Sequence, residues 1–343
     1  MTATAAARLG AGGTASRSRF RGALVGAVLG DCLGGEFEGA EEVPMDRVLQ
    51  HLSGLDQDGD CILQYSDDTA MTRCVVQSLL TRGGFDQQDM AHRFAEEYRQ
   101  SPGRGYGSGV VQVLRKLSSP RLSDVFQPAR AQFAGRGSFG NGGAMRAAPF
   151  ALAFRNIADV KRGALQPPQD FINTLISQME EVESEDQARS DARALNEPDL
   201  PFCARLHRVK ELMEQDSVSI EEVISKLGNG IAALHSVPTA IFCVLHCLEP
   251  RAGLPEQYGG LERTVAFCLA LGGDTDTIAC MAGAIAGAHC GAAAIPPAWQ
   301  RCSEGAEEAQ AWAHRLHLLY RQPPPGGDGD TQRSNTQPAT QSE

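Results

Sequence analysis

The sequence predicts an all-α fold, and three observations lead to this prediction. Hydrophobic residues make up 42% of the 343 residues but aromatic residues only 6%, so the core must be built mainly from Ala, Leu, Val and Ile. Apolar residues recur at helical spacing in many segments. No run of alternating β-branched residues is long enough to indicate a strand. No internal repeat of fixed period is present.

The two ends of the chain differ in composition from the rest. The first thirty residues contain four arginines and no acidic residue. This composition is typical of a mitochondrial transit peptide, and a disordered leader explains it equally well. The tail over residues 323–343 is rich in proline, glycine and polar residues, so it has nothing to pack and is expected to be disordered.

The first expected helix spans residues 20–33 and leads into the glycine-rich segment 30–35, which we predict to be a tight loop. Four glutamates follow in this loop, at Glu36, Glu38, Glu41 and Glu42. Each could serve as a catalytic carboxylate, and a solvated acidic loop is the simpler alternative.

A second acidic motif is Ser66-Asp67-Asp68-Thr69. Ser66 is expected to cap a helix, with Asp67 and Asp68 in its first turn. Capping and the helix dipole explain a carboxylate at this position without any ligand. A doubled Asp between two hydroxyl residues exceeds what capping requires.

Seven further helices are expected from apolar periodicity. They cover residues 87–99, 109–117, 144–154, 206–213, 220–227, 237–247 and 261–271. Residues 156–201, with two adjacent prolines and a charged run, are expected to be less regular.

A glycine-rich loop over residues 135–143 precedes one of these helices. It contains Gly-x-Gly-x-x-Gly but follows no strand pattern, and it lacks the Lys-Ser or Lys-Thr of a P-loop. A loop of exposed N–H groups that leads into a helix can hold a diphosphate, and Arg136 and Arg146 could add charge. A plain surface loop explains the pattern as well.

The most specific stretch is Gly272-Gly273-Asp274-Thr275-Asp276-Thr277. Asp274, Asp276 and the Thr277 hydroxyl are hard oxygen donors, which suit Mg²⁺, Mn²⁺ or Ca²⁺ better than zinc. We interpret it as half of a metal site whose other half is the motif at Ser66. Asp276 is expected to cap the apolar helix over residues 278–295, whose small residues favour a soluble core over a membrane span.

Charge and cysteine content exclude several classes. The net charge of −11 argues against a general nucleic-acid binder, because such binding needs clustered Lys and Arg. The ten cysteines form no Cys-x-x-Cys pair and no zinc-type spacing, and most lie in apolar segments. Reduced thiols in a reducing compartment are the expected state.

Taken together, four segments resemble the ADP-ribosylhydrolase family, in the family's order. They are the Gly30 to Glu38 loop, the motif at Ser66, the Gly135 to Gly143 loop and the Gly272 to Thr277 stretch. The resemblance implies a single domain over residues 19–322, folded as an orthogonal multi-helix bundle. It implies two Mg²⁺ ions and a catalytic or gating glutamate at Glu38. The metal ligands that it implies are Glu38, Ser66, Asp67, Asp68, Asp274, Asp276 and Thr277. The substrate-binding residues that it implies are Asp67, Phe133, Arg136, Gly137, Ser138, Phe139, Gly140, Asn141, Gly142, Leu195 and Ile231.

The activity implied is Mg²⁺-dependent hydrolysis of O-glycosidic ADP-ribose linkages on serine residues, in poly(ADP-ribose) or in O-acetyl-ADP-ribose. The implied partners are ADP-ribosylated proteins and poly(ADP-ribose), with no sequence-specific nucleic acid and no membrane. The implied setting is a monomer that acts in the DNA-damage response in the nucleus and cytoplasm, and in the mitochondrial matrix if the leader is a transit peptide.

Three departures from the family pattern stand out. Ser66 replaces a threonine, and Phe139 replaces a tyrosine. A family helix with a Thr-His pair is missing near residues 160–170, and no histidine lies between His92 and His207. The alternative reading is therefore a catalytically impaired isoform that binds ADP-ribose or has a structural role.

Overall fold

A computed structural model of the protein describes residues 14–41, 43–55, 61–119, 122–153 and 168–321. Helices form the regular structure of these residues, and beyond two isolated β-bridges no strand is present among them. The all-α prediction is therefore confirmed.

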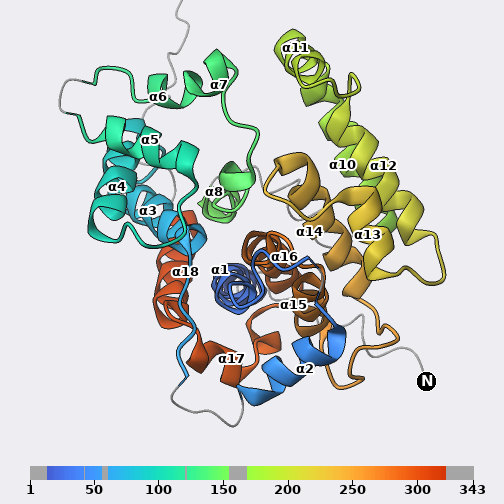
Figure 1. The fold of residues 1–343 in the computed structure, drawn as a ribbon. Coiled ribbons are helices and arrows are strands. Elements are labelled where there is room, and N and C mark those ends of the chain that lie inside the picture. The colour runs from blue at the N-terminus through green and yellow to red at the C-terminus, as the bar shows by residue number, and fades with distance from the viewer. Residues whose placement is uncertain (1–13, 42, 56–60, 120–121, 154–167, 322–343) are drawn as a thin grey trace, which may run out of the picture.

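Helix α1 (Thr14–Gly34) lies at the centre of the fold, where Figure 1 shows it nearly end-on. Helix α16 (Thr275–Cys290) packs along α1, and α18 (Ala306–Arg321) crosses beside it. Helix α15 (Gly260–Ala270) packs against α16. These helices form the core, and their fully buried side chains include Leu24, Val25, Leu29, Val265 and Ile278.

Glycines bring the backbones of α1 and α16 into contact. A Cβ atom on Gly26 would overlap the carbonyl oxygen of Gly283, and one on Gly30 would overlap that of Ala279. The prediction that residues 30–35 form a loop is wrong, because α1 continues through Gly34. These glycines allow two helices to approach closely and do not form a turn.

Two groups of helices flank this centre (Figure 1). One contains α3 (Asp67–Arg82), α4 (Gln87–Gln100), α5 (Ser108–Leu117), α6 (Gln127–Arg130) and α7 (Gln132–Gly135). The other contains α10 (Pro168–Glu183), α11 (Asp186–Ala194), α12 (Pro201–Met213), α13 (Ile220–Leu227) and α14 (Ala233–Cys247). The remaining helices are α2 (Met45–Gly54), η2 (Asn141–Gly143), α8 (Ala148–Ala153), η3 (Ala292–Ala294) and α17 (Pro297–Cys302).

Four predicted helices, over residues 87–99, 109–117, 220–227 and 261–271, agree with α4, α5, α13 and α15 to within one residue at each end. Two others are offset, since α8 begins four residues after the predicted start and α14 four residues before it. The prediction of irregular structure over residues 156–201 is wrong for α10 and α11. Pro168 stands at the start of α10, where its missing N–H breaks no helical hydrogen bond.

The expected tail lies outside the described residues, as do most of the expected leader and of the expected gap near residues 160–170. Among the helices that the structure describes, α16 included, none has the length and apolarity needed to cross a bilayer. The structure places none of the ten cysteines in a disulfide bond, and eight of them are buried.

Candidate functional site

The ends of three helices meet around a cluster of acidic side chains. The Thr277 hydroxyl, at the start of α16, lies 3.3 Å from Oδ1 of Asp68, at the start of α3. Glu38, in the turn after α1, has a carboxylate oxygen within 4.8 Å of those of Asp274 and Asp276. The structure thus brings the two predicted halves of the site together, with Glu38 beside them.

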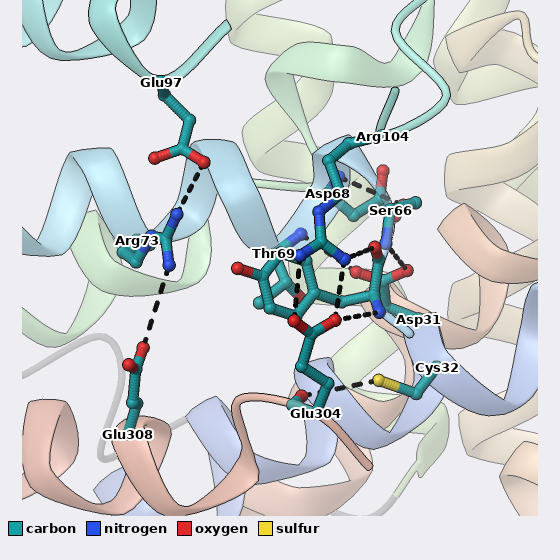
Figure 2. Close-up of polar contacts among 11 residues, drawn as sticks. Asp31, Cys32, Ser66, Asp68, Thr69, Arg73, Glu97, Arg104, Glu304 and Glu308 are labelled. Atoms are coloured by element: carbon teal, nitrogen blue, oxygen red, sulfur yellow. Dashed lines mark hydrogen bonds and ion pairs between the residues drawn. The ribbon is translucent and has the colours of Figure 1, made fainter. Parts of the chain in front are cut away.

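The α3 half is fixed by Asp31, a buried carboxylate in α1 (Figure 2). The amide of Ser66 donates to its Oδ1 at 2.9 Å, and the amide of Thr69 donates to its Oδ2 at 3.0 Å. The Ser66 hydroxyl accepts from the amide of Asp68 at 3.2 Å, so the predicted N-cap is confirmed. Burial raises the pKa of Asp31 to about 6, against the lowering effect of its hydrogen bonds.

The ion pair between Arg104 and Glu304 (Figure 2) holds the backbone of Tyr65, the residue before Ser66. Arg104 donates to both carboxylate oxygens of Glu304, at 2.7 and 2.8 Å, and to the carbonyl oxygen of Tyr65 at 3.0 Å. The guanidinium of Arg104 also lies 4.0 Å from the centroid of the Tyr65 ring. The amide of Tyr65 donates to the Glu304 carboxylate at 3.4 Å, so Arg104 and Glu304 together hold the backbone that leads into the motif.

The α16 half begins with two glycines in the left-handed region, Gly272 at φ 64° and Gly273 at φ 70°. A Cβ atom on Gly273 would overlap the carbonyl oxygen of Asn229. This close approach lets the amide of Asp274 donate to the same oxygen at 2.8 Å. Asp274 is the N-cap of α16, two residues before the predicted cap, so the prediction that Asp276 caps the helix is wrong. Asp276 lies in the first turn of α16, which spans Thr275–Cys290 and not residues 278–295.

Burial and mutual repulsion raise the pKa of four carboxyl groups in the cluster. The pKa of Asp67 is raised to about 7, first by burial and then by the charge of Asp276. The pKa of Asp274 is raised to about 7 by the same two causes. Asp68 is 1% exposed, and burial raises its pKa well above the usual range. The charge of Asp276, and then partial burial, raise the pKa of Glu38.

This donor set fits a hard divalent cation. Its potential ligands are all oxygens: Glu38, Ser66, Asp67, Asp68, Asp274, Asp276 and Thr277. Within the described parts of the chain, Oδ2 of Asp68 is buried without a hydrogen-bond partner. A buried carboxylate oxygen in this state is costly unless a cation or a donor satisfies it. The N-termini of α3 and α16 supply only partial positive charge.

The glycine-rich loop runs beside residues 231–233. The amide of Asn141 donates to the carbonyl oxygen of Ile231 at 3.0 Å, and the amide of Ala233 donates to that of Phe139 at 2.9 Å. The rings of Phe133 and Phe139 are 6.0 Å apart. Ile231 is 74% exposed and Phe133 is 55% exposed, so an apolar surface beside the loop is open to solvent.

Arg136 connects this loop to the end of α11. Its guanidinium donates to the carbonyl oxygens of Phe133 at 3.2 Å and of Ala194 at 3.4 Å, next to the half-buried Leu195. Arg146, by contrast, lies with its guanidinium 5.1 Å from the centroid of the Phe94 ring, and its charge lowers the pKa of Asp67. The structure thus brings ten of the predicted substrate-binding residues into one region. They are Phe133, Arg136, Gly137, Ser138, Phe139, Gly140, Asn141, Gly142, Leu195 and Ile231.

Sequence reasoning missed three residues that support the site: Asp31, Arg104 and Glu304. A carboxylate inside an otherwise apolar helix is a usable signal for Asp31, because such a group requires buried donors. Arg104 and Glu304 lie 200 residues apart and belong to no recognisable motif, so only the folded chain reveals the pair.

Comparison with known proteins identifies close relatives. Residues 13–325 match the model of the ADP-ribosylglycohydrolase family. The chain is 65% identical to ADP-ribosylhydrolase ARH3 of Danio rerio, over 94% of this chain and 95% of that protein. It is 45% identical to ADP-ribosylhydrolase ARH3 of Homo sapiens, over 90% of this chain and 96% of that protein.

A solved structure described as an ADP-ribosylglycohydrolase-related protein complex has the same fold. It covers 89% of this chain and 99% of its own, with a TM-score of 0.51 and 22% sequence identity. The family match covers nearly the whole described chain, and the relatives are matched over almost their full length. The chain therefore belongs to the ADP-ribosylglycohydrolase family.

Proposed function

We propose that this protein is a Mg²⁺-dependent hydrolase that cleaves O-glycosidic linkages of ADP-ribose. The observation that carries the proposal is that the Asp68 and Asp274 motifs meet in one acidic cluster, with the exposed Glu38 beside it. The relatives named ADP-ribosylhydrolase support the reaction class. The proposed substrates are ADP-ribosyl-serine on proteins, poly(ADP-ribose) and O-acetyl-ADP-ribose.

Two Mg²⁺ ions are the proposed cofactors. The residues that would hold them are Glu38, Ser66, Asp67, Asp68, Asp274, Asp276 and Thr277. When bound, such ions supply Lewis-acid stabilisation of developing negative charge and fix the orientation of ribose hydroxyls. Bound ions would also offset the negative charge of these carboxylates, which would otherwise repel an anionic substrate from a protein whose net charge is −11.

Glu38 is the proposed acid/base residue. Its pKa is raised by the charge of Asp276, so its carboxyl group holds a proton more readily than an ordinary glutamate. In hydrolysis, the bond between ribose C1 and the serine oxygen breaks, and the serine oxygen takes up a proton that Glu38 can donate. A water oxygen bonds to C1, and the proton that this water releases returns to the Glu38 carboxylate. Glu38 is exposed, so it can also act as a metal ligand that is released when substrate enters.

The glycine-rich loop is the proposed diphosphate site. Gly135 and Gly137 have positive φ, and residues 136–140 are exposed or partly exposed, so their amides can face a bound phosphate. The exposed Ile231 and Phe133 offer apolar surface for an adenine ring. We further propose that the protein is a monomer that acts on modified proteins in the nucleus and cytoplasm. A mitochondrial form is proposed if the leader is cleaved.

The test is release of ADP-ribose from a serine-modified peptide, from poly(ADP-ribose) and from O-acetyl-ADP-ribose, each with Mg²⁺ and with a chelator. We expect release from at least one substrate, lost with the chelator and in Asp274→Ala and Asp276→Ala. Full Mg²⁺-dependent hydrolysis by both variants would contradict the proposal.

A second candidate is an ADP-ribose-binding protein without turnover. The match to the Danio rerio relative spans 356 positions, more than the 343 residues of this chain, so that relative has residues with no counterpart here. Thermal stabilisation by Mg²⁺ and ADP-ribose without hydrolysis of any of the three substrates would select this candidate.

A further inference from the structure

Asn141 is unlike the rest of the glycine-rich loop. Its neighbours Ser138 and Gly140 are exposed, whereas Asn141 is 7% exposed. Its side-chain Nδ2 donates to Oδ2 of Asp274 at 2.5 Å and to the hydroxyl of Ser236 at 3.0 Å. One residue therefore has its backbone in the loop and its side chain at the acidic cluster.

The surrounding backbone ties the same two regions together. The amide of Asn141 donates to the carbonyl oxygen of Ile231, and the amide of Asp274 donates to that of Asn229. Residues 229–231 thus accept from both the loop and the start of α16. A displacement of the loop would be transmitted to Asp274 through this segment as well as through the Asn141 side chain.

The contact has the chemistry of a group that orients a ligand. An amide N–H donated to a carboxylate oxygen restricts the rotation of that carboxylate, and it favours the ionised form, as the lowering effect of Asn141 on the pKa of Asp274 reflects. Partners of this kind, outside the ligand set itself, commonly change metal affinity by 10- to 100-fold when removed.

We propose that Asn141 is a positioning residue that couples order in the diphosphate loop to the affinity of the acidic cluster for Mg²⁺. The inference rests on the proposed function, since it takes the loop as the diphosphate site and the cluster as the Mg²⁺ site. Asn141 acts through Asp274. When the diphosphate orders the loop, the Asn141 side chain holds the Asp274 carboxylate in position to bind the cation. By thermodynamic reciprocity, bound Mg²⁺ must then order the loop.

The first test is calorimetric titration of the purified protein with Mg²⁺ alone, without nucleotide. We expect Asn141→Ala and Asn141→Ser to bind Mg²⁺ about tenfold more weakly than the wild type. Asn173→Ala is the matched control, because the exposed Asn173 in α10 accepts from the Lys210 ammonium at 3.0 Å, outside both the loop and the acidic cluster. It should leave the Mg²⁺ affinity unchanged. Ser236→Ala removes the other partner of the amide and should have a smaller effect than Asn141→Ala.

The second test is hydrogen exchange of the loop amides over residues 137–140, with and without Mg²⁺. In the wild type, Mg²⁺ alone should slow this exchange several-fold, and in Asn141→Ser it should not. A purely structural role of Asn141 would change exchange equally with and without Mg²⁺. If Asn141→Ala does not fold, the wild-type exchange and the Asn141→Ser titration decide the question.

Different results would overturn the proposed function and the proposed role of Asn141. A wild-type protein that binds no Mg²⁺ would overturn the proposed function. A wild type that binds Mg²⁺, together with Asn141 variants of equal affinity and a loop whose exchange ignores Mg²⁺, would overturn this inference alone.

Discussion

The hydroxyl of Thr277 lies 3.3 Å from a carboxylate oxygen of Asp68, although 209 residues separate the two in the sequence. The contact joins the N-termini of α16 and α3, and it places buried carboxylates from both helices side by side. Such an arrangement stores repulsion in the cation-free protein, and a bound cation would relieve it.

The stored repulsion should lower the stability of the Mg²⁺-free protein. Asp68→Asn should raise the free energy of unfolding of the Mg²⁺-free protein by about 1–3 kcal/mol, because the buried Asp68 carboxyl must stay charged or take up a proton when the chain folds, and Asn has neither cost. The same variant should lose stabilisation by Mg²⁺. Denaturant unfolding with a chelator and with Mg²⁺ measures both effects. A metal-free variant less stable than the wild type would show that the carboxylate of Asp68 is satisfied within the protein.

The second prediction concerns pH. The pKa values of Asp67 and Asp274, about 7 without a cation, exceed the ordinary value of 3.8, so the folded protein binds more protons than the unfolded chain between about pH 4 and 7. The stability that these groups contribute is present below pH 4 and is lost as pH rises through 7. Mg²⁺ must displace these protons, so its stabilising effect should grow with pH.

Melting temperatures with and without Mg²⁺ between pH 5.5 and 8 test this. The difference should be small at pH 5.5 and large at pH 8, and Asp67→Asn should flatten its dependence on pH. A Mg²⁺ effect of equal size at both ends of the range would be inconsistent with raised pKa values in the cluster.

The third prediction concerns the contact between α1 and α16. Gly30→Ala and Gly283→Ala each place a methyl group on a facing backbone, so each should lower the free energy of unfolding by about 1–3 kcal/mol or more. Gly54→Ala is the control, because a Cβ atom there would have no neighbour within 4 Å. Urea unfolding of the wild type and the three variants measures these changes in the free energy of unfolding. Equal stability of all three would mean that the two helices are not in close contact.

The fourth prediction concerns Asp31. In Asp31→Asn, an amide replaces one of the two oxygens that accept from Ser66 and Thr69, so one hydrogen bond is lost and two donors face each other. We expect a loss of about 1–3 kcal/mol in the free energy of unfolding and Mg²⁺ binding about tenfold weaker.

Asp46→Asn is its matched control, because Asp46 is exposed in the first turn of α2 and accepts from the adjacent amide of Arg47. The control should stay within about 0.5 kcal/mol of the wild type. Urea unfolding and Mg²⁺ calorimetry provide the two readouts. An Asp31→Asn variant with unchanged stability and Mg²⁺ affinity would show that Asp31 does not hold the α3 motif.

Features with local causes could be predicted from the sequence. Ser66 as an N-cap, Asp67 and Asp68 in the first turn of α3, and the oxygen donors before α16 each follow from a few neighbouring residues. The positive φ of Gly272 and Gly273 belongs to the same kind, since only glycine takes this conformation without strain.

Features that depend on contacts between distant parts of the chain could not be predicted from the sequence. The glycines of α1 resemble loop residues until Gly26 is seen against Gly283 in α16. Asn141 resembles a residue of a surface loop until Asp274, 133 residues away, is placed beside it. Helix α10 is a different case, because two adjacent prolines suggest irregular structure, whereas Pro168 is the first residue of the helix, a position that proline favours.

The most direct test of the central claim, that both acidic motifs form one Mg²⁺ centre, is calorimetric Mg²⁺ binding by the wild type, Asp68→Asn and Asp274→Asn. The wild type should bind two Mg²⁺ per chain, and each variant, from opposite halves of the site, should lose binding of at least one ion while remaining folded. Wild-type affinity and stoichiometry in either variant, or a wild type that binds no Mg²⁺, would contradict the claim.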